Sequence, residues 1–589
     1  MLDTIIRGGT VVDGNSTTPV RADIGISNGI IAEISPHISS AARQVIDAED
    51  HIVTPGFIDV HTHYDGQVSW DDTLDPSFEH GVTTVIMGNC GCGFAPVRPG
   101  GEARLIDVME GVEDIPGTAL YEGVPWGAWE TFPQYLDYLA TKKFTMDVGT
   151  HITHGALRVY VMGERGVFSK HAGSEDIQQM ASLVAEGMAA GAMGFSTNRI
   201  IAHRGVSGEP VPGTFAADEE MLTIASAMQG SKHGVVQMIP ASVSGKEPNR
   251  NPDPHRKEHE VALMGEMSRR SGRPVTFTMF QNADDPEEWR GWMQLAKEQE
   301  TEGARLFPQI PARPPGLVTG LSGYHAFQRR EFYLQIAHLP LEERARIMRD
   351  PAVKTRILAD HSIPAEPPGS NDNVYQYIEP RMARLHPLGS KVNYEPDIGN
   401  SVGERAKQSG QSLESVLYDL YLEDEGRAFL LLAEKNYIYN DHETIRELLL
   451  SADTLQGLGD AGAHMKYVCD ASIPSYALSH WVRDRTRGQK LPLETIVAKL
   501  TAANADFYGM ADRGRLEVGK RADINVIKLD RLDLKLPEMR WDLPQGSGRL
   551  VQPVTGYAAI LQNGTVTRRH DQDTGERPGR LIRGNAFAN

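Results

Sequence analysis

The feature that most constrains the fold is a long alternation of strand and helix patterns that begins near residue 54. In one unit, apolar residues recur at helical spacing over 177–184, after Ser174, which can cap that helix. Gly191 ends the helix, and a strand pattern follows over 192–196. Repeated units of this kind are typical of a parallel sheet covered by helices. The pattern therefore predicts an α/β protein.

The length of the alternating region, residues 54–510, favours a TIM-like (β/α)8 barrel over an open sheet. Short β-branched runs broken by turn residues occupy both chain ends, 1–53 and 511–589, so we expect β-structure on either side of the barrel. Residues from about 317 to 402 interrupt the alternation with a charged helix and a proline-rich loop. We expect a helical insertion there, which is either a lid or a decoration of the barrel.

Charge and composition narrow the class of partner. The chain has 589 residues and a net charge of −19, which disfavours nucleic acid or an anionic membrane surface as the main partner. Its three cysteines form no disulfide framework, which fits a reducing compartment. No segment approaches the roughly 18 uninterrupted apolar residues of a membrane span. We expect a cytoplasmic protein that binds a small molecule, and a homo-oligomer is compatible with the sequence.

Two histidines separated by one residue follow the apolar run that starts at Phe57, in "TPGFIDVHTHYDGQ". Residues two apart on a strand point to the same face, so His61 and His63 project together. Functional residues of a parallel barrel lie at the carboxyl ends of its strands, where this pair lies. We predict a shared metal ion, and the alternative is a polar turn that happens to contain two histidines.

Two further strand ends offer metal ligands. Cys90 follows the predicted strand 82–87, and a thiolate is a good zinc ligand, although a lone cysteine is often a small buried apolar residue. Asp460 lies in "TLQGLGDAGAH" after a late strand. It is either a turn former or a carboxylate that binds the metal and acts as general base and then general acid.

A third group of strand-end residues offers polar contacts to a substrate. His154 and Arg158 lie in "GTHITHGALRVYVMG", and His203 follows the next strand. His154 can bind metal, polarise a carbonyl or hold a carboxylate, and Arg158 can pair with a carboxylate or stabilise a loop. We list all three as candidate substrate-binding residues.

Seven segments follow one another along the chain: "PGFIDVHTHYDG", "GVTTVIMGNCGCGFAP", "HGALRVYVMG", "GAMGFSTN", "GDAGAH", "RGRLEVGKRADINVI" and "DTGERPGRLIRG". In this order they resemble the amidohydrolase superfamily, and most closely its D-aminoacylase (N-acyl-D-amino-acid deacylase) family. The resemblance spans nearly the whole chain, and the first two segments are its most specific part. It implies a TIM-like barrel beside a small β-sandwich that is built from both chain ends.

The resemblance also implies a zinc-dependent hydrolase in which metal-activated water attacks an amide carbonyl. On this pattern His61, His63 and Cys90 are metal ligands, and Asp460 is a ligand and the acid/base. The family normally supplies two more histidines, one from each of the fifth and sixth strands. The matching segments here offer Gln237 and Gln281, and the family's substrate-binding lysine and arginine are missing as well. We therefore expect one tight zinc ion and a second that is weak or absent.

Three functions stay open at this point. The first is hydrolysis of a C–N amide bond in a small N-acyl compound, such as an N-acyl-D-amino acid. The second is hydrolysis of a cyclic, aryl or other amide that is not an amino-acid derivative, which the missing clamp residues motivate. The third is a barrel that binds a ligand without catalysis, against which the retention of His61, His63, Cys90 and Asp460 together argues.

Overall fold

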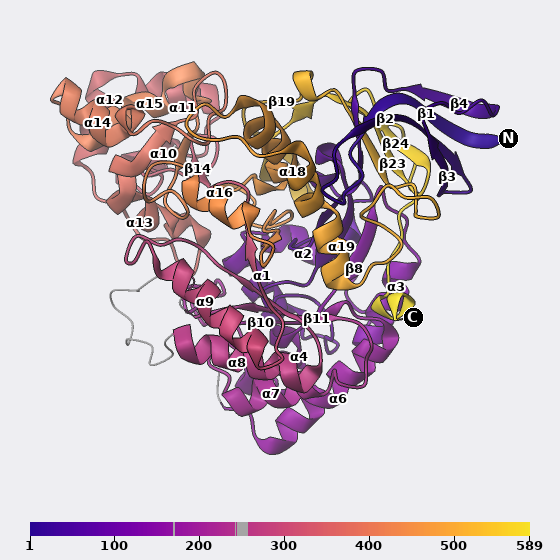
Figure 1. Ribbon diagram of the computed structural model, residues 1–589. Coiled ribbons are helices and arrows are strands. Elements are labelled where there is room, and N and C mark those ends of the chain that lie inside the picture. The colour runs from indigo at the N-terminus through magenta and orange to yellow at the C-terminus, as the bar shows by residue number, and fades with distance from the viewer. Residues whose placement is uncertain (169–170, 242, 244–256, 589) are drawn as a thin grey trace.

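Both ends of the chain pair with each other in one nine-stranded sheet of the computed structural model, which describes residues 1–168, 171–241, 243 and 257–588 (Figure 1). The strand order is β25-β24-β23-β18-β5-β1-β2-β3, with β4 paired to β1. The N-terminal strands are β1 (Leu2–Val11), β2 (Val20–Ser27), β3 (Ile30–Ser35), β4 (Ala42–Asp47) and β5 (Ile52–Pro55). The C-terminal strands are β18 (Ile524–Ile527), β23 (Tyr557–Gln562), β24 (Thr565–Arg569) and β25 (Gln572–Asp573). The antiparallel pair of β5 and β18 joins the two halves.

Two parallel sheets lie between these ends of the chain. One has the order β6-β7-β8 and the other has the order β17-β13-β12-β11-β10-β9. The strands are β6 (Phe57–Asp59), β7 (Val82–Met87), β8 (Asp147–Thr150), β9 (Ile152–Thr153), β10 (Gly194–Asn198), β11 (Val235–Ile239), β12 (Val275–Thr278), β13 (Leu306–Ile310) and β17 (Leu455–Gln456). Only His151 separates β8 from β9, and a parallel bridge joins Thr62 to Ala461, just beyond β6 and β17. These links connect the two sheets at both of their edges.

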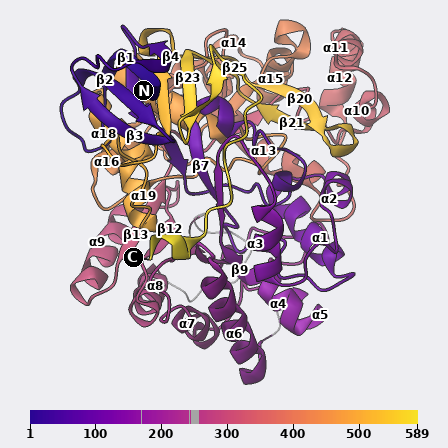
Figure 2. The same cartoon turned by 90° about the vertical axis from the view of Figure 1, so that its right-hand side faces the viewer.

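Helices connect successive strands and cover the sheets, as Figures 1 and 2 show. They include α4 (His154–Met162), α6 (Ser174–Ala190), α7 (Asp218–Ser226), α8 (Lys257–Ser271), α9 (Glu288–Thr301), α16 (Glu443–Leu450), α18 (Leu493–Leu500) and α19 (Ala502–Tyr508). In the described part of the chain, no helix combines the length and the apolar character needed to cross a membrane. After the terminal sheet, the chain turns back and pairs with β8 through Leu581 and Val148 (Figure 2).

The helix α6 illustrates how local sequence sets an element. Its apolar residues Ile177, Met180 and Val184 are buried, and Gly191 ends it with a left-handed backbone at φ 110°. At its start, Gly173 rather than Ser174 occupies the cap position, and the Gly173 N–H donates to the Asp176 carboxylate at 2.9 Å. The predicted span is correct, and a different residue caps it.

A largely helical segment stands apart from the parallel sheets, at the upper left of Figure 1. Its strands β14 (Leu317–Thr319), β15 (Leu385–Pro387) and β16 (Leu430–Leu432) form a small antiparallel sheet in the order β14-β16-β15. Its helices are α10 (Glu331–Ile336), α11 (Leu341–Met348), α12 (Pro351–Ala359), α13 (Tyr375–Ile378), α14 (Val402–Ser409) and α15 (Leu413–Tyr421). A hydrophobic cluster of its own runs from Leu321 to Leu432. The segment therefore continues past residue 402, because β16 pairs with both β14 and β15.

The remaining elements lie in loops around these layers. They are α1 (Glu102–Glu113), α2 (Gly117–Gly123), α3 (Phe132–Ala140), α5 (Glu164–Val167), α17 (Ile473–Tyr476), β19 (Asp533–Leu534), β20 (Glu538–Leu543), β21 (Ser547–Val551) and β22 (Val554–Thr555). The last residue of α1, Glu113, lines a pocket that is also lined by His61 and His63.

Candidate metal centre

His61 and His63 follow β6 and are both about 1% exposed. The Asp59 carboxylate accepts the backbone N–H of His61 at 3.0 Å and so fixes the turn out of the strand. The backbone N–H of Asp460 donates to the His61 carbonyl at 3.0 Å, and that of His63 donates to the Ala461 carbonyl at 2.7 Å. The segments after β6 and β17 are thus held together, and this brings Asp460 beside the two histidines.

Four donor atoms converge at this point. The Sγ atom of Cys90 lies 3.2 Å from His61 Nε2 and 3.5 Å from His63 Nε2. The Oδ1 atom of Asp460 lies 3.4 Å from His61 Nε2 and 3.9 Å from His63 Nε2. Of the four predicted ligands, His61, His63 and Cys90 form a compact triad of potential metal ligands, and Asp460 closes the group from the side of the pocket.

With zinc–ligand bonds of about 2.0–2.3 Å, tetrahedral geometry places neighbouring donor atoms about 3.3–3.8 Å apart. The separations of 3.2 and 3.5 Å between Cys90 Sγ and the two histidines are close to this spacing, and these three residues form the compact triad. Asp460 Oδ1 lies 3.4 and 3.9 Å from the two histidines and outside that triad. Imidazole, thiolate and carboxylate are donor types that zinc binds. The triad therefore fits a zinc ion in both geometry and chemistry, with Asp460 beside it.

Neighbouring strands orient these ligands. Gln309 on β13 accepts a hydrogen bond from His61 Nδ1 at 2.7 Å, which leaves the Nε2 lone pair directed at the other donors. Gln237 on β11 accepts the backbone N–H of Cys90 at 2.9 Å. Cys90 and Asp460 both have left-handed backbones, at φ 59° and φ 44°. Strained backbone of this kind clusters at functional sites, where the surrounding structure holds it in place.

Burial sets the protonation states of the group. It lowers the pKa of His61 to about 4 and that of His63 well below its usual value, so both imidazoles are neutral at pH 7. Burial raises the pKa of the Cys90 thiol and of the Asp460 carboxyl well above their usual values. Neutral imidazole is the form that binds a metal, and a bound cation favours the ionised thiol and carboxylate.

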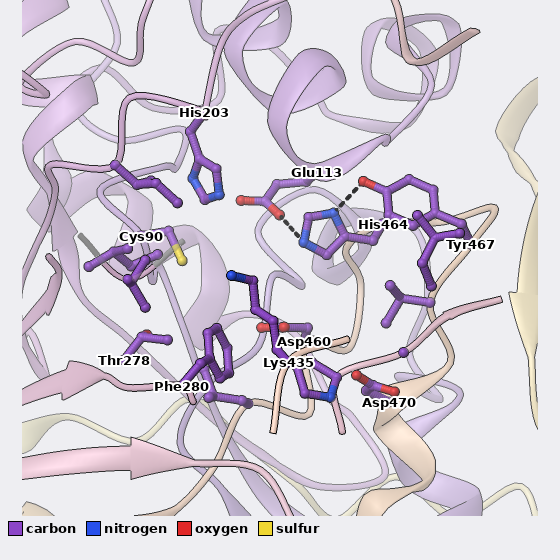
Figure 3. A pocket seen from close by; sticks show the side chains of 18 of the residues that line it. Cys90, Glu113, His203, Thr278, Phe280, Lys435, Asp460, His464, Tyr467 and Asp470 are labelled. Carbon is purple, nitrogen blue, oxygen red and sulfur yellow. Dashed lines mark hydrogen bonds and ion pairs between the residues drawn. The ribbon is translucent and has the colours of Figure 1, made fainter. Parts of the chain in front are cut away.

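The four donors lie in a pocket of about 350 Å³ (Figure 3). Most of its lining is apolar and comes from the strand ends and from the segment 317–432: Ile200, Ile239, Val243, Phe280, Leu317, Val374, Leu432, Leu458 and Val468. The polar lining includes His203, His464, Tyr467 and Lys435. Lys435 points into the pocket beside Phe280, and its Nζ donates to the Asn282 side chain at 2.8 Å. The lining also contains the carboxylates of Glu113, Glu434 and Asp470. Apolar walls with convergent polar groups are typical of a small-molecule site.

The three predicted substrate-binding residues separate in the structure. His203 lines the pocket. His154 and Arg158, at the start of α4, lie outside the lining residues and instead hold Glu220 on α7. His154 Nε2 lies 2.9 Å from the Glu220 carboxylate, and its Nδ1 lies 2.9 Å from Thr197 Oγ1. His154 and Arg158 therefore belong to a buried ion-pair cluster with Glu220, and neither is among the residues that line the pocket.

The two glutamines at the fifth and sixth strands do not line the pocket either. Gln237 binds the Cys90 backbone, and Gln281 binds Asn436 and Thr444. The pocket-facing residues of these strands are instead Ile239, Thr278 and Phe280. Among the described residues, these strands therefore present Ile239, Thr278 and Phe280, and no imidazole, to the pocket.

Sequence reasoning missed three residues of the site. Gln309 lies on a strand with no charged or sulfur-containing neighbour to mark it. Glu113 ends a helix and Lys435 lies in the loop after β16, so neither follows a strand of the parallel sheets. A search restricted to the ends of those strands cannot find Glu113 or Lys435, and only the packing of their segments brings these two residues into the pocket.

A second cluster of potential ligands, Glu395, His442 and His480, has a different character. Both oxygens of Glu395 accept hydrogen bonds from the buried Arg485, at 3.0 and 3.1 Å. Its Oε1 also accepts the His442 backbone N–H, and its Oε2 lies 3.0 Å from His480 Nε2. Both carboxylate oxygens of Glu395 are therefore occupied by hydrogen-bond donors of the protein. We interpret the cluster as an internal ion pair between Glu395 and Arg485.

Comparison with known proteins places this site in a family. The model of the amidohydrolase family Amidohydro_3 matches residues 44–361 and 435–550. D-aminoacylase of Alcaligenes xylosoxydans xylosoxydans is 24% identical over 588 residues, which cover 98% of this chain and 97% of that protein. A solved D-aminoacylase structure, described as having a binuclear metal centre, aligns with a TM-score of 0.63 and 21% identity over 99% of this chain and all of the other.

A solved N-acyl-D-glutamate deacylase of Bordetella bronchiseptica, complexed with zinc and a phosphonate inhibitor, aligns with a TM-score of 0.63 and 22% identity over 99% of both chains. These structures show a shared fold. The family match and the full-length relatives confirm the resemblance expected from the motifs. The chain belongs to the amidohydrolase family and is a D-aminoacylase-like, metal-dependent hydrolase of C–N bonds other than peptide bonds.

Proposed function

We propose that this protein is a zinc-dependent amidohydrolase that cleaves the amide bond of a small N-acyl compound, with N-acyl-D-amino acids as the leading substrate class. The observation that carries the proposal is the compact triad of His61, His63 and Cys90, with the Asp460 carboxylate beside it, inside a pocket. The names of the full-length relatives support the substrate class.

We further propose that the two parallel sheets close into one (β/α)8 barrel. Its eight positions are β6, β7, β8 with β9, β10, β11, β12, β13 and β17. The bridge between Thr62 and Ala461 supports closure at one edge, and the hydrogen bond from the Met193 N–H to the Thr150 carbonyl supports it at the other. On this division, the terminal sheet is the second domain and the segment 317–432 is an insertion that supplies one wall of the pocket.

One tight metal ion fits the pocket better than two. A second ion in this family takes imidazoles from the fifth and sixth strands, where this pocket has Ile239, Thr278 and Phe280. Ile239 and Phe280 offer no lone pair to a cation, and the Thr278 hydroxyl replaces an imidazole, which zinc prefers. We therefore propose a single zinc ion held by His61, His63 and Cys90, which leaves a position for water beside the Asp460 carboxylate.

Zinc, when bound, supplies Lewis-acid activation of water and of the scissile carbonyl. The role of Asp460 is proton transfer: its carboxylate takes the proton of the attacking water and returns it to the leaving nitrogen. Asp460 suits this role because its side chain is about 20% exposed, lines the pocket and lies 3.4 Å from His61 Nε2. Its left-handed backbone fixes the direction of the carboxylate.

His203 is positioned to donate a hydrogen bond to the carbonyl oxygen. Asn198 Oδ1 accepts the backbone N–H of Ile200 at 2.8 Å, which fixes the orientation of that amide. Asn198 Nδ2 then donates to His203 Nδ1 at 3.2 Å, so the neutral imidazole carries its proton on Nε2. Burial lowers the pKa of His203 to about 3, so it stays neutral while it donates. A neutral N–H donor stabilises the negative charge that develops on the carbonyl oxygen.

Lys435 supplies a positive charge inside the pocket, where a negatively charged group of the substrate can pair with it. It comes from the loop after β16, and its side chain passes along Phe280 into the pocket (Figure 3). A carboxylate beside the scissile amide would pair with it, and the apolar wall would accept an acyl chain or side chain. If the substrate is a neutral cyclic or aryl amide, Lys435 makes no such pair.

A substrate panel separates these cases. We expect turnover of N-acyl-D-amino acids with apolar acyl groups and little turnover of the matching amino-acid amides, which lack the carboxylate. Lys435→Met should raise KM for the acids by at least about tenfold and leave neutral amides unchanged, whereas Lys407→Met, on the exposed helix α14, should change neither. Turnover confined to neutral amides would reject the N-acyl-amino-acid assignment.

Asp460→Asn tests the chemistry itself. The variant should fold and keep some metal but lose turnover by about a hundredfold or more, because the proton acceptor is gone. Elemental mass spectrometry and steady-state kinetics on the same sample separate metal loss from loss of proton transfer. Near-normal turnover by this variant would remove Asp460 from the proposed mechanism.

A further inference from the structure

Glu113 is a buried carboxylate in the metal pocket to which the proposed reaction gives no role. It is the last residue of α1, its side chain is about 1% exposed, and it lines the pocket beside His63. An ionised carboxylate at this depth is costly unless a positive charge or hydrogen-bond donors compensate it. Its nearest potential partners are the imidazoles of His63 and His464.

The two oxygens of Glu113 face two different histidines. Oε1 lies 3.4 Å from His63 Nδ1, and in the described part of the chain neither of these buried atoms has a hydrogen-bond partner. Oε2 lies 3.7 Å from His464 Nε2, and His464 Nδ1 lies 2.9 Å from the Tyr467 hydroxyl. Figure 3 shows Glu113, His464 and Tyr467 as a continuous polar chain along one wall of the pocket.

The backbone next to Glu113 holds the loop that carries Asp460. The Glu113 carbonyl accepts the backbone N–H of His464. The carboxylate of the following residue, Asp114, accepts the Lys466 backbone N–H at 2.9 Å and the Tyr324 hydroxyl at 2.6 Å. The end of α1 is thus fixed against the loop after β17, so the Glu113 carboxylate is held in place beside His63.

The two metal-binding imidazoles are supported by different groups. His61 Nδ1 has the neutral amide oxygen of Gln309 at 2.7 Å, whereas His63 Nδ1 faces the carboxylate of Glu113. A carboxylate behind a ligating imidazole fixes the tautomer, directs the opposite nitrogen at the metal and makes that nitrogen a stronger donor. A cation in the site would in turn compensate the buried charge of Glu113.

We propose that Glu113 is a positioning residue of the metal centre, which holds His63 with Nε2 toward the ion and strengthens metal binding. The inference rests on the proposed metal site. Glu113, at the end of α1, would orient His63 as Gln309 orients His61. It predicts that removing the charge of Glu113, with its shape kept, weakens metal binding while the fold persists.

The test is a cobalt titration of the metal-free protein, followed by the absorption bands of the Co²⁺ ion and by competition with a chelator. Glu113→Gln should bind Co²⁺ about 10- to 100-fold more weakly than the wild-type chain and shift the visible bands, since the donor strength of His63 changes. Glu110→Gln, one turn earlier on the same helix, is the matched control and should bind Co²⁺ as the wild type does. The thermal midpoint of the metal-free Glu113→Gln protein should be close to that of the wild type, because glutamine keeps the shape of the side chain.

Three outcomes would overturn the inference. Co²⁺ affinity of Glu113→Gln within threefold of the wild type, with unchanged bands, rejects it and leaves the metal centre intact. A lower thermal midpoint with unchanged affinity assigns Glu113 a purely structural role. No Co²⁺ binding by the wild-type chain rejects the proposed metal centre itself, and the inference with it. If Glu113→Gln does not fold, Glu113→Asp is titrated instead: its shorter reach should weaken Co²⁺ binding several-fold, and wild-type affinity would reject the role.

Discussion

Replacing Glu220 by glutamine should destabilise the fold and leave the chemistry of the folded enzyme unchanged. Glu220 is about 1% exposed and accepts hydrogen bonds from Arg158 at 2.5 and 2.7 Å. Its partners, His154 and Arg158, are the two residues for which the sequence predicted substrate contacts. The variant therefore tests whether the cluster supports the fold or binds substrate.

The structure sets the size of the effect. Burial by itself would raise the pKa of Glu220, but His154 and Arg158 together lower it from 4.5 to about 2. Burial lowers the pKa of His154, so at pH 7 the ion pair is the one between Glu220 and Arg158. Removing one member of a buried ion pair costs about 3–5 kcal/mol, which is the size of the loss that we expect.

The pH dependence has a definite sign. The pKa of Glu220 is lowered in the folded state, so its contribution is complete above pH 4.5 and is lost as the pH falls toward 2. Glutamine does not titrate. The difference in the free energy of unfolding between the wild type and Glu220→Gln should therefore be largest near neutral pH and shrink on acidification.

Urea unfolding at pH 7 and pH 4, followed by circular dichroism, measures both effects. Glu219→Gln, the exposed neighbour on α7, is the control and should lie within about 0.5 kcal/mol of the wild type. Steady-state kinetics of folded Glu220→Gln should give the wild-type KM. A loss of stability below about 1 kcal/mol together with a raised KM would refute the structural role and return His154 and Arg158 to the substrate site.

Three further predictions follow from the metal centre and its surroundings. Elemental mass spectrometry should find about one zinc ion per chain in the wild type, and His61→Ala combined with His63→Ala should reduce it to a trace. Gln309→Leu should weaken Co²⁺ binding about tenfold or more, because the His61 Nδ1–H loses its acceptor; unchanged affinity in chelator competition would contradict this. Arg313→Met should cost about 3–5 kcal/mol in urea unfolding, since it leaves the buried Asp470 carboxylate unpaired; a cost below about 1 kcal/mol would contradict the ion pair.

The sequence alone predicted the positions of most of the donor atoms. Buried parallel strands are short apolar runs, and residues directly after them lie at one edge of the sheet. This rule located His61, His63, Cys90 and Asp460, and in the structure the two histidines lie 3.2–3.9 Å from the Cys90 and Asp460 donor atoms. The rule also located His203, which lines the same pocket.

The same rule could not separate residues in the pocket from residues beside it. His154 also follows a strand, but α4 begins there and turns the side chain toward α7. Gln237 and Ile239 both belong to β11 and are two residues apart, so strand periodicity places them on one face. Only their depth along the strand decides that Gln237 binds the Cys90 backbone while Ile239 lines the pocket.

The sequence by itself determined the family, the alternating architecture and the ligands that follow strands, because these depend on local patterns and on residue types with few alternative uses. The tertiary structure decided which other groups complete the site. Glu113 comes from a helix end and Lys435 from the loop after the helical segment, and both are far in sequence from the strands that they approach. The packing of these elements against one another sets such contacts, and no local pattern in a single sequence records it.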